Sequence, residues 1–150
     1  MAAERLRPRG FTLLELLVVL ALVALALALV PPMFSRGVHG AELKAAARQV
    51  AAGLKEGRSR AIARNLEVAV AVDVEAHSLR VGETTPSRAL PAALTLKLVI
   101  AESERRGESG GTIRFFPDGS STGGRVTLSL GESSYDVEVD WLTGRVSTRH

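Results

Sequence analysis

Residues 119–123 read Gly-Ser-Ser-Thr-Gly, which formally matches the G-x-S-x-G pattern of a hydrolase nucleophile. That chemistry requires a serine on a turn from a strand into a helix, within reach of a histidine. Here a strand pattern follows at Arg125, and the only histidine downstream is His150. The segment also lacks the lysine of a phosphate-binding loop. A Gly- and Ser-rich connection between two strands accounts for it, so the sequence predicts neither hydrolysis nor nucleotide binding.

Metal ligands and thiol chemistry are the next candidates. The chain has no cysteine, which excludes a disulfide, a thiol nucleophile and a Cys-ligated metal. The histidines have no metal-ligand spacing; they are His39, His77 and His150. Asp136, Glu138 and Asp140 lie on one face of a predicted strand, about 7 Å apart per step, and would suit a cation. A solvated strand face explains them more simply, so no catalytic residue, metal or cofactor is predicted.

Glu15 stands inside the most apolar stretch of the chain. From Phe11 to Val30, 18 of 20 residues are apolar, with no Gly or Pro. Twenty helical residues span roughly 30 Å, the thickness of the hydrocarbon core of a bilayer. A carboxylate in such a helix costs on the order of 2–3 kcal/mol at mid-membrane, and less near the edge. The sequence therefore predicts a transmembrane helix over Phe11 to Val30 and a special role for Glu15.

The residues on either side of this stretch set its orientation. Arg5, Arg7 and Arg9 precede it and predict a cytoplasmic N-terminus, with everything after Val30 on the far side. A secretory signal fits poorly, because its apolar region is normally about 7–15 residues and ends at a small-x-small cleavage site. Here the run is longer and ends at Pro31-Pro32. A plain anchor fits the length but leaves Glu15 unexplained.

Residues 9–15, Arg-Gly-Phe-Thr-Leu-Leu-Glu, resemble the processing motif of type IV pilins and type II secretion pseudopilins. In that family a prepilin peptidase cuts after the glycine on the cytoplasmic face, and the new N-terminal residue is N-methylated. A glutamate is retained five residues into the processed chain. The resemblance implies cleavage between Gly10 and Phe11, methylation of Phe11, and an assembly role for Glu15.

Elementary electrostatics agrees with this assignment. Cleavage creates a cationic amine on Phe11, one helical turn from Glu15. When subunits stack, Glu15 of one subunit can meet the amine of a neighbour in a low-dielectric bundle. A paired buried charge is tolerable where a lone one is not, and the pairing fixes the axial register.

The segments after the apolar run position the rest of the chain. Pro31-Pro32 is predicted to end or kink the first helix. An amphipathic helical stem follows, and its apolar stripe covers a sheet; the stripe comprises Leu43, Ala47, Val50, Leu54 and Ala61. The basic residues of the stem would suit nucleic acid or anionic lipid, but a solvated helix face is the simpler explanation.

From Glu67 the apolar period changes from helix-like to two. The predicted strands cover residues 67–74, 79–81, 94–100, 112–116, 125–130 and 135–141, and Tyr135 and Trp141 are expected in the core. Residues 82–92 and 101–111 are polar with Gly or Pro and are predicted loops. One long N-terminal helix packed on an antiparallel β-sheet head makes the fold α+β and pilin-like. The expected segments are a cleaved cytoplasmic leader 1–10, a transmembrane or filament-core helix 11–31, an amphipathic stem 32–64 and a β-rich head 65–150.

Two further segments narrow the resemblance. Residues 115–124, Phe-Phe-Pro-Asp-Gly-Ser-Ser-Thr-Gly-Gly, and 142–146, Leu-Thr-Gly-Arg-Val, resemble the loop and closing segment of the minor pseudopilin H family. The resemblance implies a structural subunit of the type II secretion pseudopilus, which drives export of folded proteins across the outer membrane. Its implied partners are the prepilin peptidase, other pseudopilins and the inner-membrane assembly platform. Its implied location is the bacterial inner membrane, as a single-pass protein with a periplasmic head.

Two alternatives remain open at this point. A minor pilin of a type IV pilus would serve assembly or DNA uptake, and DNA-binding relatives have a Gly-Arg-x-Arg pattern. Here Gly144-Arg145-Val146-Ser147 lacks the second arginine. Of 19 basic and 16 acidic residues, the leader holds three arginines and one glutamate, so the processed chain carries only +1, which argues against a nucleic acid partner. A membrane-tethered enzyme is the second alternative, and it has no catalytic constellation behind it.

Overall fold

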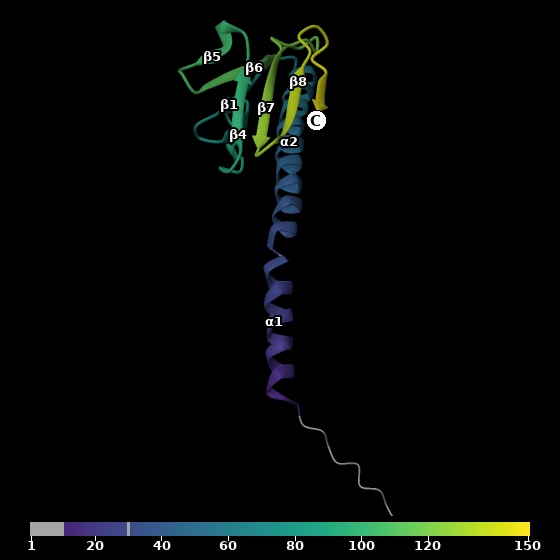
Figure 1. Cartoon of the computed structure of the whole chain (residues 1–150). Coiled ribbons are helices and arrows are strands. Elements are labelled where there is room, and N and C mark those ends of the chain that lie inside the picture. The colour runs from purple at the N-terminus through teal and green to yellow at the C-terminus, as the bar shows by residue number, and fades with distance from the viewer. Residues whose placement is uncertain (1–10, 30) are drawn as a thin grey trace, which may run out of the picture. The chain divides into compact units, whose positions relative to one another are not determined.

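The computed structural model describes residues 11–29 and 31–150 (Figure 1). Residues 28, 29 and 31–39 are described by their backbone alone. The predicted leader, including Gly10, lies outside the described residues. The chain divides into two compact units, Met1–Val38 and His39–His150.

From Leu13 onward, the N-terminal unit is helical where it is described. Helix α1 (Leu13–Leu29) has 17 residues, mostly Leu, Val and Ala. Leu and Ala have high helix propensity, and Val is tolerated in a helix. Helix α2 (Pro31–Arg64) begins at the proline pair, where the missing backbone N–H groups belong to the first turn and cost no hydrogen bond. Residue 30, between α1 and α2, lies outside the described residues, so the predicted interruption at Pro31-Pro32 stays a prediction. Within the described parts of the chain, no helix combines the length and apolarity that crossing a membrane requires.

From His39 onward, α2 belongs to the second unit and supplies one side of its core. The whole predicted stripe is buried: Leu43, Ala47, Val50, Leu54 and Ala61. Two glycines bring the helix backbone against the strands. A Cβ on Gly53 would lie 2.4 Å from Leu79 Cδ2, and a Cβ on Gly57 would lie 2.5 Å from Val70 Cγ2. Since no side chain fits there, α2 packs on the sheet closer than an ordinary helix face allows.

The strands form two antiparallel sheets rather than the single predicted sheet. The five-stranded sheet has the order β3 (Arg88–Ala89), β2 (Ser78–Val81), β1 (Val68–Asp73), β6 (Gly110–Phe115), β5 (Arg105–Arg106). The four-stranded sheet has the order β4 (Thr95–Val99), β7 (Gly124–Leu130), β8 (Ser133–Val139), β9 (Val146–Arg149). Apolar side chains of α2 and of both sheets share one core, with Phe115 its largest fully buried member. The predicted α+β fold is confirmed.

The predicted strands are confirmed to within a few residues, but three details differ. The predicted loops 82–92 and 101–111 hold the short strands β3 and β5 and the 3-10 turn η1 (Glu102–Glu104). Strand β9 was not predicted. The prediction that Trp141 is buried is wrong, because β8 ends at Val139 and the Trp141 side chain, 66% exposed, stands in the following turn. Tyr135 is only partly buried and packs against the edge of the core.

The turn between β1 and β2 joins the two sheets through His77. Its Nδ1 lies 3.1 Å from the carbonyl oxygen of Glu75, and its Nε2 lies 2.8 Å from that of Leu94, just before β4. Both carbonyls only accept, so only the imidazolium form donates both hydrogen bonds. The Leu94 and Glu75 carbonyls raise the pKa of His77, and Asp73 adds a smaller effect in the same direction.

We therefore expect the head to lose stability as the pH rises through the pKa of folded His77. The folded pKa lies above the unfolded value of about 6.5, so the stabilisation is complete below that value and is lost above the folded pKa. Urea unfolding between about pH 5 and 8 should show this decrease, and the variant His77→Gln should lack that component. Identical pH profiles for the two proteins would contradict the role of the imidazolium.

Candidate functional site

The apolar N-terminal segment presents its side chains outward. Every leucine and valine from Leu13 to Leu27 is exposed, and Phe11 is 82% exposed. Fully burying one such side chain is worth about 1.5–3 kcal/mol, so a helix that leaves all of them in water is strongly unfavourable. This segment therefore requires an apolar surrounding.

Phe11 and Glu15 lie on either side of the start of α1. Thr12 is the capping residue: its Oγ1 accepts a hydrogen bond of 3.2 Å from the Glu15 backbone N–H, and its carbonyl accepts one of 3.1 Å from Leu16. Threonine followed three residues later by glutamate is the capping-box pattern. The positive end of the helix dipole favours a carboxylate at this position. Glu15 is therefore both the glutamate of the capping pattern and the predicted assembly residue.

The Glu15 side chain is exposed and has no ion-pair partner among the residues that the structure describes. Of the three residues predicted for processing and assembly, Phe11 and Glu15 are described, and Gly10 is not. The backbone around Phe11 is not yet helical, whereas Glu15 is in the first turn. The cleavage and methylation assigned to Gly10 and Phe11 remain predictions.

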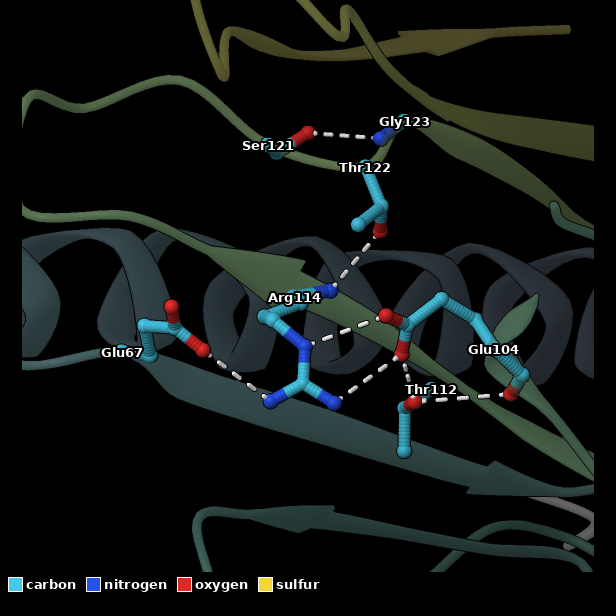
Figure 2. A network of polar contacts seen from close by, with 7 residues as sticks. All are labelled: Glu67, Glu104, Thr112, Arg114, Ser121, Thr122 and Gly123. Carbon is cyan, nitrogen blue, oxygen red and sulfur yellow. Dashed lines mark hydrogen bonds and ion pairs between the residues drawn. The ribbon is translucent and has the colours of Figure 1, made fainter.

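In the head, a polar network surrounds Arg114 on β6 (Figure 2). Its Nε donates to Glu104 Oε1 at 3.0 Å, and one of its Nη atoms lies 3.3 Å from Glu67 Oε2. Thr112 also donates to Glu104. Burial by itself raises the pKa of Glu104, but the hydrogen bonds from Thr112 and Arg114 outweigh it and leave this pKa below its ordinary value. A buried carboxylate thus anchors the residues of η1 to the sheet.

Sequence reasoning missed this network. It predicted residues 101–111 as a loop, and it gave no role to Glu104 or Arg114. The one available signal is weak: Thr112 and Arg114 alternate with apolar Ile113, which places both on the outer face of a strand. Nothing in that alternation identifies Glu104, ten residues away, as their partner.

The residues that resemble a hydrolase motif are structural. The segment 119–123 connects β6 to β7, so a strand rather than a helix follows it. Ser121 is buried, its backbone N–H donates to the Trp141 carbonyl at 2.9 Å, and its Oγ accepts from the Gly123 backbone N–H at 2.9 Å. The neighbouring Thr122 Oγ1 accepts from the Arg114 backbone N–H at 3.0 Å, as Figure 2 shows. These contacts hold a turn in which the serine at the centre of the motif, Ser121, is buried.

The carboxylates of Asp136, Glu138 and Asp140, considered above as cation ligands, each have different hydrogen-bond or ion-pair partners. Asp136 accepts from Thr127 at 2.6 Å, and Glu138 pairs with Arg125 at 3.3 Å. Asp140 lies beyond the end of β8, where hydrogen bonds from the Thr143 side chain and backbone lower its pKa. No group of three or more potential metal ligands among His, Cys, Asp and Glu occurs in the part of the chain that the structure describes.

The two head segments singled out in the sequence meet in space. Arg58 Nε on α2 donates to the Gly119 carbonyl at 3.0 Å, and Gly144 packs against the same carbonyl. A Cβ on Gly144 would lie 2.1 Å from that oxygen. Gly144 has φ of +60° and donates to the Asp140 carbonyl at 2.8 Å, which closes the turn between β8 and β9. This junction joins the helix, the loop 115–124 and the segment 142–146.

Comparison with protein families gives two matches. Residues 46–144 match the model described as type II transport protein GspH. Residues 5–31 match the prokaryotic N-terminal methylation motif. The chain is also 36% identical over 143 residues to type II secretion system protein H of Xanthomonas campestris pv. campestris, covering 92% of this chain and 81% of that protein.

Solved structures provide a comparison of folds. The type IV minor pilin FimU of Pseudomonas aeruginosa aligns with a TM-score of 0.56 and 16% identity, covering 73% of this chain and 89% of that one. The minor pseudopilin EpsH from the type 2 secretion system of Vibrio cholerae aligns with a TM-score of 0.56 and 16% identity, covering 72% and 96%. Both show the same pilin-like fold, a helix packed on antiparallel sheets.

Proposed function

Because this chain belongs to the type II transport protein GspH family, we propose that it is a minor pseudopilin, a structural, non-enzymatic subunit of the type II secretion pseudopilus. The observation that carries the proposal is the match of residues 46–144, which includes most of the head and residues 46–64 of α2. The methylation motif at residues 5–31 supports processing by a prepilin peptidase and anchoring in the inner membrane.

Each segment of the chain has its own role, which its composition supports. The leader, residues 1–10, is removed after Gly10. The apolar residues 11–31 hold the chain in the membrane and later pack in the filament core, which supplies the apolar surrounding that the exposed leucines require. Residues 32–64 are the stem, and residues 65–150 form the head. The basic leader supports a cytoplasmic N-terminus and a periplasmic head.

Assembly depends on the pair formed by the new amine of Phe11 and Glu15. Phe11 just precedes α1 and Glu15 lies in its first turn, where its carboxylate is exposed and can be reached by a neighbouring subunit. The proposed partners are the prepilin peptidase, other pseudopilins and the inner-membrane assembly platform. The growing filament pushes folded proteins through the outer membrane, and this chain is one of its minor subunits.

A minor pilin of a type IV pilus is the second candidate, because the fold of FimU is equally similar to this one. The two functions predict different effects of deleting this chain. Deleting this chain should stop export of folded proteins and leave pilus-dependent motility and DNA uptake unchanged. The reverse result would favour the pilus.

Processing gives the direct test of the N-terminal assignment. Mass spectrometry of the protein from its native membrane should find that it starts at Phe11 and carries one added methyl group. Gly10→Val should retain the leader, because a branched side chain stands next to the bond to be cut. Gly40→Val, a glycine of α2 with open space around it, should be processed normally. Recovery of the unprocessed chain from cells with an active prepilin peptidase would contradict the assignment.

A further inference from the structure

A groove lies along the side of α2 where the helix borders β8. Three cationic residues of α2 line it, Lys44, Arg48 and Lys55, together with Ala51, Ala52 and Tyr135. Its volume is about 360 Å³. All of these residues belong to the second unit, so the groove is a feature of the head and its helix alone.

The charge of the groove has one sign. Its cations follow one another at spacings of four and seven residues, which places them on one face of the helix. No carboxylate lines the groove. None of the three cations has an ion-pair partner among the described residues, whereas Arg60, on another side of the same helix, pairs with Glu56. The groove therefore lacks a compensating negative charge.

The floor of the groove is apolar. Ala51 and Ala52 contribute only methyl groups, so the backbone of another element can approach α2 closely. Most of the lining between the cations is apolar, which distinguishes the groove from a uniformly basic surface of the kind that binds nucleic acid. An occupant that fits must combine an apolar stripe with carboxylates, and an amphipathic helix presents both on one side.

We propose that this groove docks an acidic amphipathic helix of a partner protein in the assembled filament. The inference rests on the proposed function, because it places the partner among the filament subunits. Carboxylates of the partner face Lys44, Arg48 and Lys55, and its small apolar residues lie on the alanine floor. Charge complementarity of this kind sets the register and the rate of association.

The experiment uses the full chain in cells that produce the complete secretion system. A benzophenone amino acid replaces Ala52, the exposed residue of the floor, and the cross-linked peptide is identified by mass spectrometry. We expect a peptide from a helix of another filament subunit that carries glutamate or aspartate on one face. The combined variant Lys44→Glu, Arg48→Glu and Lys55→Glu should lower its yield by at least about tenfold. Reversing Arg80, Lys97 and Arg106, three exposed cations of the sheets, is the matched control and should not lower it.

Other results overturn the inference. A cross-link only to lipid, only to a second copy of this chain, or to a segment without carboxylates would show that the occupant has a different chemistry. If charge reversal leaves the cross-linking yield unchanged, the three cations do not contribute to docking. If the chain is processed and present in the filament but Ala52 cross-links nothing, this inference alone fails. If the chain is absent from the filament, the proposed function fails with it.

Discussion

Replacing Gly144 by alanine is expected to lower the free energy of unfolding of the head by about 2–5 kcal/mol. Two effects add. A non-glycine residue at φ of +60° costs about 1–2 kcal/mol. In addition, the new Cβ would lie 2.1 Å from the Gly119 carbonyl oxygen, and relieving such an overlap in a packed site costs about another 1–3 kcal/mol. That oxygen also accepts the hydrogen bond of Arg58, so the displacement loosens helix and loop together.

Gly131, in the turn between β7 and β8, provides the matched control. It has nearly the same backbone angle, φ of +61°, but an added Cβ would meet nothing within 4 Å. Gly131→Ala should therefore show only the backbone cost of about 1–2 kcal/mol. Urea unfolding of a His39–His150 fragment, which contains all the described core residues, measures both variants. Equal destabilisation by the two substitutions would show that the contact with Gly119 contributes nothing.

Glu15→Ala is expected to leave the chain cleaved and membrane-inserted but to exclude it from the filament. Without the carboxylate, the amine on Phe11 of a neighbouring subunit is buried without a partner. Leaving one charge of a buried pair alone costs about 3–5 kcal/mol, which corresponds to at least about a 100-fold loss of incorporation. The measurement is the amount of this chain in sheared filaments relative to the membrane, with N-terminal processing followed in the same samples.

Leu16→Ala is the control for this experiment, because it shortens the adjacent exposed side chain in the same helical turn and keeps the carboxylate. It should reduce incorporation far less than Glu15→Ala. Normal co-purification of the Glu15→Ala chain with the other subunits would contradict the assembly role of Glu15. A chain that keeps its leader would instead show that Glu15 acts at the processing step.

The sequence was most informative where structure depends on neighbours in the chain. The stripe from Leu43 to Ala61 and the alternation from Val68 to Val74 are local periodicities, and the helix and strand they predicted are present. The motif around Glu15 is local too, which is why it was recognised. The Thr12 cap lies within it, although the capping box itself was not noticed before the structure.

What the sequence did not predict depends on residues distant from one another. Arg114 pairs with residues 10 and 47 positions away, and neither distance leaves a pattern in the chain. Trp141 continued the alternation of its strand, but pairing with β9 ends at Val139 and the chain turns there. Strand β9 itself is polar and only four residues long, so its assignment depends on the partner strand rather than on its composition.

The close contact of α2 with β1 and β2 has a mechanical consequence. Leu79 and Val70 occupy the spaces opposite Gly53 and Gly57, and Arg58, the residue after Gly57, donates a hydrogen bond to the Gly119 carbonyl. A force along the helix axis therefore loads these contacts together, in shear. Residues His39–Arg64 of α2 pass that load directly to the strands on which they pack.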